Sequence, residues 1–150
     1  MIYDLPGGIM SYTKKKVAEV TGLTPRLVQF YTERGVVTPE VDEGRGRGRF
    51  RLYSRNNILE FAVINELVSY GMTVYKIGVI LQALRDSGFL NWQGLYKTDA
   101  FVIIYQRENA RYIKPDFRLS YNKPLELKKI DGYDSALVIN LGQTLSRLKT

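Results

Sequence analysis

The chain has 150 residues, of which 45% are hydrophobic and 25% are charged, which fits one domain or a small domain with an appendage. The absence of cysteine and histidine excludes disulfides, thiolate metal sites, iron–sulfur clusters and catalysis by a Cys or His nucleophile. No apolar stretch approaches the roughly 18 residues of a membrane span, and no N-terminal targeting signal is present. We therefore expect a soluble, cytoplasmic protein.

Positive charge dominates the sequence and gathers in two parts of it. The net charge is +7 at pH 7. Residues 1–55 hold 10 Lys or Arg against 6 Asp or Glu, and residues 91–150 hold the same numbers. Residues 56–90 are nearly neutral and rich in Ile, Leu and Val. This pattern predicts an apolar middle section with basic surfaces on either side, which favours a polyanionic partner.

Two short helices about a glycine turn are predicted near the N-terminus. Apolar residues at helical spacing predict a helix over residues 14–21, and Gly22 supplies the turn. A second helix begins at Pro25, because the Thr24 hydroxyl can cap it and proline suits the first helical position. Gly35 is placed to close that helix. The pair forms a helix-turn-helix, whose second helix lies in the major groove of DNA.

A basic loop follows the second helix. In residues 41–53, four arginines alternate first with glycines and then with Phe50 and Leu52. Alternation of period two predicts a strand, and the glycines predict a flexible tip between two strand arms. A basic β-loop beside a helix-turn-helix is a wing that can reach phosphates or a narrow minor groove. The alternatives are a solvated, mobile loop and a nucleotide-binding glycine loop, and we discard the second because no apolar strand precedes it and no suitable helix follows.

Two longer amphipathic helices come next. Ser54 can cap a helix over about residues 55–70, and Thr73 can cap another over about residues 74–86. Each is followed by a glycine that can end it. We interpret both helices as scaffold rather than as a binding site.

Several of these pieces recur together at a fixed spacing, in residues 12–25, 28–31, 35–39, 50–54, 67–71 and 73–77. Apart from an enlarged wing, they resemble the MerR family of transcription regulators over about residues 11–86. The resemblance implies a winged helix-turn-helix that binds operator DNA as a homodimer. Many family members remodel a promoter with a long spacer so that RNA polymerase can use it.

The resemblance and the charge pattern together single out the residues expected to contact DNA: Lys14, Lys15, Lys16, Thr24, Pro25, Arg26, Gln29, Phe30, Tyr31, Arg45, Arg47, Arg49, Arg51 and Tyr53. Two positions depart from the family pattern. Gln29 stands where an arginine is usual, which removes one phosphate contact, and Phe50 replaces the first tyrosine of the wing motif. The alternatives to a DNA contact are a core position for Tyr31 and a solvated helix face for the three lysines.

The C-terminal section lacks the long dimerisation helix that the family usually carries. Strands are predicted over residues 100–106, 125–130 and 136–141, an edge strand within 111–121, and a helical turn or two over 143–149. Aromatic residues could line a small apolar pocket there, although a core position is the commoner role: Trp92, Tyr96, Tyr105, Tyr112, Phe117 and Tyr121. We find no cofactor or metal motif.

The expected fold is α+β and has three parts. Residues 1–11 are a flexible leader, residues 12–88 are the DNA-binding domain, and residues 89–150 are a small β-rich dimerisation or effector domain. The predicted function is a homodimeric, sequence-specific transcription regulator on a pseudo-palindromic operator, with RNA polymerase and an unknown small-molecule effector as possible partners. The alternatives are an architectural protein of the excisionase or DNA-segregation type, and an enzyme or ligand-binding β-module, which the sequence disfavours because no catalytic constellation is present.

Overall fold

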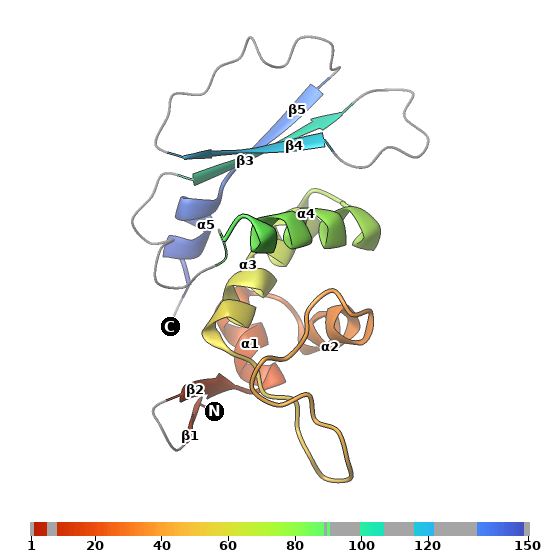
Figure 1. Cartoon of the computed structure of the whole chain (residues 1–150), viewed down its shortest axis with the longest axis vertical. Helices are drawn as coiled ribbons and strands as arrows, with labels where there is room; N and C mark the ends of the chain where they lie inside the picture. Colours follow the sequence, from red (N-terminus) through yellow and green to blue (C-terminus); the bar gives the residue numbers. More distant parts are fainter. Residues whose placement is uncertain are drawn as a thin grey trace.

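The computed structural model describes residues 2–5, 9–88, 90, 100–106, 116–121 and 135–148. Its elements, in chain order, are β1 (Ile2–Leu5), β2 (Ile9–Tyr12), α1 (Lys14–Thr21), α2 (Pro25–Glu33), α3 (Arg55–Ser69), α4 (Val74–Asp86), β3 (Ala100–Gln106), β4 (Asp116–Tyr121), β5 (Ser135–Asn140) and α5 (Leu141–Ser146). Figure 1 shows the sheet of β3, β4 and β5 at one end, α3, α4 and α5 in the middle, and α1, α2 and the wing at the other end. The predicted α+β fold is confirmed.

The helices begin where the sequence predicts because their caps are made. The Thr13 hydroxyl accepts a hydrogen bond from the Lys16 backbone N–H at 3.3 Å, and the Thr24 hydroxyl accepts one from that of Leu27 at 3.2 Å. These bonds satisfy backbone donors that the first helical turn leaves unpaired. Between the two helices, Gly22 adopts a φ of +82°, and a Cβ atom there would lie 3.3 Å from the Asn65 side chain. The turn therefore favours glycine for its backbone and for its close packing.

The middle helices supply most of the core. α3 is buried around most of its circumference, with Ile58, Phe61 and Ile64 fully inaccessible, and α4 buries Ile77, Ile80 and Leu84 on one side. An apolar surface of this extent is the main source of folding free energy in a small domain. The helix-turn-helix is therefore held by packing on α3, and the sequence interpretation of α3 and α4 as scaffold agrees with this burial.

The N-terminal segment differs from the expected flexible leader. β1 and β2 pair antiparallel, with Ile2 opposite Tyr12 and Leu5 opposite Ile9. β2 is joined on its other side to the end of the wing, where Tyr12 and Tyr53 exchange backbone hydrogen bonds of 2.9 and 2.8 Å. These strands were not predicted from the sequence, because short strands depend on their pairing partners more than on their own residues.

The C-terminal section forms an antiparallel sheet in the order β4-β3-β5. Ile104 of β3, Ile139 of β5 and Leu141 of α5 join the core cluster of the N-terminal helices, and α5 packs against α3. β4 lies at the sheet edge as predicted, and Tyr105 is buried, which agrees with a core position. The predicted strand at 125–130 and the aromatics Trp92, Tyr96 and Tyr112 lie outside the described residues.

No helix among the described residues is both long and apolar enough to cross a membrane. Within the same part of the chain, no group of three or more His, Cys, Asp or Glu side chains is placed to hold a metal ion.

Candidate nucleic-acid interface

α2 separates an inward face from an outward one. Leu27, Val28 and Tyr31 turn toward the core, and Val28 and Tyr31 are buried. Arg26 and Phe30 lie four residues apart, as do Gln29 and Glu33, and this spacing places all four on one helical face. Thr24, Pro25 and Arg26 are exposed at the start of the helix. An exposed helix N-terminus carries a partial positive charge and suits a phosphate.

Two of the predicted DNA-contacting residues lie in the interior instead. Tyr31 is 4% exposed and Tyr53 is 0% exposed. The Tyr53 hydroxyl lies 2.9 Å from the Thr32 hydroxyl and shares a hydrogen bond with it. Burial raises the pKa of both phenols above the ordinary tyrosine value, so both stay neutral. Core packing, the alternative that the sequence left open for Tyr31, is thus the role of both rings.

Phe30 and Arg34 form the C-terminal edge of the same helix. The Phe30 ring is half-buried and lies edge-on to Tyr31, with ring centroids 5.3 Å apart. The Arg34 guanidinium lies over the Phe30 ring at 5.2 Å from its centroid, within cation–π range. Phe30 therefore packs against Tyr31 on one side and the Arg34 guanidinium on another.

The wing is a loop closed by a single bridge rather than by two long strand arms. Asp42 and Leu52 exchange backbone hydrogen bonds of 3.1 and 2.8 Å. Inside the loop, Gly44 has a φ of +70°, and a Cβ atom there would lie 2.9 Å from the Arg51 backbone nitrogen. Only glycine fits such a close approach without a shift. The repeated glycines thus shape the loop, and the predicted wing is present with shorter arms.

Three of the four wing arginines are paired with carboxylates. Arg45 lies 2.6 Å from Glu43, Arg49 lies 3.2 Å from Asp42, and Arg51 of the wing lies 3.8 Å from Glu33 of α2. Arg47 is exposed and makes no ion pair with any described residue. All of these pairs are at the surface, where such contacts are weak and exchangeable. The arginines therefore remain available to a polyanion.

The three lysines of α1 have different surroundings. The Lys14 ammonium donates a hydrogen bond to the Gln29 side-chain oxygen at 2.9 Å, which joins α1 to α2. Lys16 is half-buried and pairs with Glu19 at 3.1 Å, while Lys15 is exposed. Lys14 thus lies beside the outward face of α2. We call the set of Lys14, Arg26, Arg45, Arg47, Arg49 and Arg51 the basic rim.

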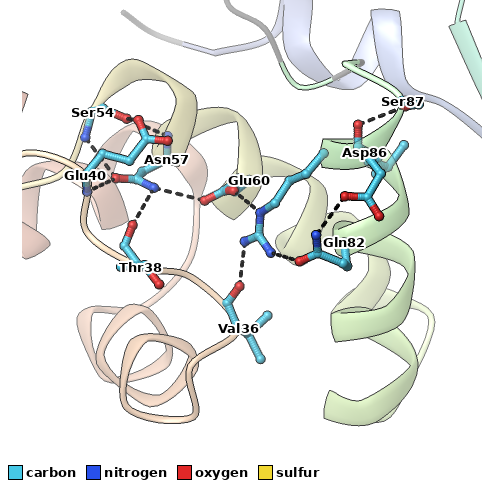
Figure 2. Close-up of polar contacts among 11 residues, drawn as sticks. Val36, Thr38, Glu40, Ser54, Asn57, Glu60, Gln82, Asp86 and Ser87 are labelled. Carbon is cyan, nitrogen blue, oxygen red and sulfur yellow. Dashed lines mark hydrogen bonds and ion pairs between the residues drawn. The ribbon is translucent and has the colours of Figure 1, made fainter.

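A polar cluster that the sequence did not reveal holds the segment between α2 and the wing (Figure 2). The Asn57 amide donates to the Thr38 carbonyl at 3.0 Å and to Glu60 at 2.9 Å, and it accepts from the Glu40 backbone N–H at 2.9 Å. Arg85 of α4 donates to Glu60 at 2.5 Å and to the Val36 carbonyl at 2.6 Å. The exit from the second helix is therefore fixed to α3 and α4.

This polar cluster is internally satisfied. It borders a cavity of about 480 Å³, whose lining also includes Asn56, Gln82 and Leu90. Among the described residues, no buried side-chain nitrogen or oxygen lacks a hydrogen-bond partner. Because buried polar groups are costly when unpaired, this arrangement points to a structural role for the cluster. One sequence signal existed in advance, since Ser54 and Asn57 have capping-box spacing and make both of its hydrogen bonds.

A helix-turn-helix with a basic wing, packed on two scaffold helices, defines a DNA-binding domain of the winged type. Residues 12–84 match the model of the MerR HTH family of regulatory proteins. The N-terminal domain therefore belongs to the MerR family.

Individual relatives agree with this assignment. The chain is 26% identical to an uncharacterised HTH-type transcriptional regulator of Mycobacterium tuberculosis over 110 residues. This aligned region covers 73% of the chain and 49% of the relative. The chain is also 29% identical to the HTH-type transcriptional regulator CueR of Escherichia coli over 70 residues. This second aligned region covers 47% of the chain and 50% of CueR. The chain thus spans about half the length of these relatives.

Proposed function

We propose that the protein is a transcription regulator that binds double-stranded DNA through α2 and the wing. The observation that carries this proposal is the basic rim, because Lys14 of α1 contacts Gln29 in the middle of α2, Arg51 of the wing contacts Glu33 at its end, and Arg26 is exposed at its start. Cations in this arrangement can contact phosphates on both sides of a major groove that holds α2. The relatives, all HTH-type transcriptional regulators by name, support the same function.

Within this proposal the DNA-contacting residues have different tasks. Arg26 lies at the start of α2, where a guanidinium can reach a base edge, and Thr24 and Pro25 sit beside it at the backbone. Lys14, Lys15 and the wing arginines supply contacts to phosphates or to the minor groove. Gln29 and Phe30 lie on the outward face of α2, whereas Tyr31 and Tyr53 support it from inside.

The functional unit in this proposal is a homodimer on a pseudo-palindromic operator, acting in the cytoplasm at the nucleoid. The C-terminal section supplies the dimer contact, and RNA polymerase is the partner at the promoter. The role is one of binding rather than catalysis, since the chain has no Cys or His for nucleophilic chemistry. The same fold would serve an architectural protein that bends or bridges DNA, which is the competing function.

Selection of bound sequences from a random duplex pool, followed by footprinting of the enriched sequence, tests the proposal. We expect a pseudo-palindrome that is protected on both halves, with a protein mass in solution twice that of the chain. Salt-sensitive binding to every duplex, with no enriched sequence, would favour the architectural function. No binding to any duplex would refute both.

A further inference from the structure

A row of contacts crosses the basic rim from α1 to the wing. The Lys14 ammonium donates to the Gln29 side-chain oxygen at 2.9 Å, and the Gln29 side-chain nitrogen donates to the Glu33 carboxylate at 2.7 Å. Glu33 in turn lies 3.8 Å from the Arg51 guanidinium. Gln29 is thus the member that joins a cation of the first helix to the carboxylate that faces the wing.

The chemistry of the two neighbours explains why an amide stands at position 29. An ammonium group only donates hydrogen bonds, and a carboxylate only accepts them. A primary amide can accept from the first and donate to the second at the same time. Turning the amide over would place its NH₂ group against the Lys14 ammonium and its oxygen against the Glu33 carboxylate, so the neighbours fix one orientation.

Other side chains of similar length satisfy only one of these neighbours. An arginine or lysine has no acceptor for Lys14 and would repel it. A glutamate could accept from Lys14 but would repel Glu33, which lies four residues away on the same helical face. Glutamine therefore matches this position through both of its polar atoms.

We propose that Gln29 is a positioning residue of the DNA interface, which holds the Lys14 ammonium beside α2 so that it meets a phosphate. This inference rests on the proposed function, because it assigns a role within DNA binding. In this role Gln29 makes no contact with a base, and its effect on binding passes through Lys14.

A double-mutant cycle between Gln29→Ala and Lys14→Ala tests the proposal. Affinity is measured for two duplexes, one enriched from the random pool by this chain and one of random sequence, at several salt concentrations. We expect Gln29→Ala to weaken binding about two- to fivefold, the range of an exposed charged contact. The loss should be equal on both duplexes, because phosphate contacts are independent of sequence.

The salt dependence gives a readout that a merely structural role would not change. Lys14→Ala should lower the slope of log K against log salt concentration by about 0.9, the value for one phosphate contact. Gln29→Ala should lower the same slope although it removes no charge, and it should have no further effect in the Lys14→Ala background. Gln82→Ala, which removes an exposed glutamine of α4 that donates to Asp86 four residues further on, is the matched control and should change neither affinity nor slope.

The remaining outcomes contradict the inference. A loss confined to the enriched duplex that persists without Lys14 would show that Gln29 reads a base directly. An unchanged affinity and slope in Gln29→Ala would show that Lys14 needs no positioning. If the unaltered protein binds neither duplex, the proposed function fails, and this result is distinct from a failure of the positioning role alone.

Discussion

Two clusters in this protein are built from the same three groups but lie in different surroundings. In the interior, the Asn57 amide donates to Glu60, which also accepts from Arg85; at the basic rim, the Gln29 amide donates to Glu33, which pairs with Arg51. The side chains of Glu60 and Arg85 are 7% and 28% exposed, whereas those of Glu33 and Arg51 are 52% and 38% exposed. The two clusters therefore share an amide, a carboxylate and a guanidinium, and they differ in how far the ion pair is buried.

The difference follows from solvent. Water and salt weaken an exposed ion pair, so its partners can exchange it for a phosphate at little cost. A carboxylate that is only 7% exposed gains little hydration when it loses its cation, so breaking the pair is costly. We therefore expect changes in the interior cluster to affect stability, and changes at the rim to affect binding.

The largest effect is expected from Arg85→Met, which leaves the Glu60 carboxylate buried without its cation. We expect the free energy of unfolding to fall by about 3 kcal/mol, as measured by urea denaturation. Arg147→Met is the control, because Arg147 is exposed, and it should stay within about 0.5 kcal/mol of the unaltered protein. Equal stability of the two variants would remove the distinction between interior and rim.

Arg26→Ala is expected to act on sequence preference rather than on folding. If this side chain reads a base, the variant should lose about 1–3 kcal/mol of binding free energy on the enriched duplex and much less on random DNA. Competition binding between the two duplexes measures the difference. Equal losses on both would reassign Arg26 to a phosphate contact.

The wing backbone is expected to tolerate little change at Gly44, although the wing arginines can exchange their carboxylate partners for phosphates. Gly44 and Gly48 both have positive φ, but only at Gly44 would an added Cβ approach the backbone of Arg51, at 2.9 Å. A left-handed conformation alone costs an alanine about 1–2 kcal/mol. Urea denaturation should therefore show a larger loss for Gly44→Ala than for Gly48→Ala. A reversed order would contradict the close packing of the wing.

The smallest effect on stability is expected from Glu33→Gln. The ion pair with Arg51 is exposed, so its removal should change the free energy of unfolding by at most about 1 kcal/mol. Binding to random DNA should become tighter, since one negative charge leaves the interface and Arg51 is released to phosphate. Fluorescence anisotropy with a random duplex measures this. Weaker binding would mean that Glu33 holds Arg51 in its productive place.

Local chemistry made much of the fold predictable. The caps at Thr13, Thr24, Ser54 and Thr73 place the starts of four helices, and the residues that form the wing were recognised from alternating arginine and glycine. The β1–β2 pairing was not predicted, and neither was the bridge from Tyr12 to Tyr53, whose partner lies far along the chain. Short strands of this kind have little intrinsic preference of their own.

The candidate site was less predictable than the fold. Charge and spacing pointed to the arginines, but they did not reveal that Tyr53 and Tyr31 are interior or that Glu33, Asp42 and Glu43 pair with the wing. The Asn57–Glu60–Arg85 cluster could not be predicted either, because its members have the spacing of ordinary exposed helix residues and meet only when α3 and α4 pack together. Side-chain partners at these positions come from tertiary contacts.

The most direct test of the DNA interface is the salt dependence of binding for the unaltered protein and for the triple variant Arg47→Ala, Arg49→Ala, Arg51→Ala. If each arginine neutralises one phosphate, the slope of log K against log salt concentration should fall by about 2.7, at about 0.9 per contact. The free energy of unfolding should change little, because the three side chains lie at the surface. An unchanged slope would show that the wing does not touch DNA, and would contradict the interface proposed for this protein.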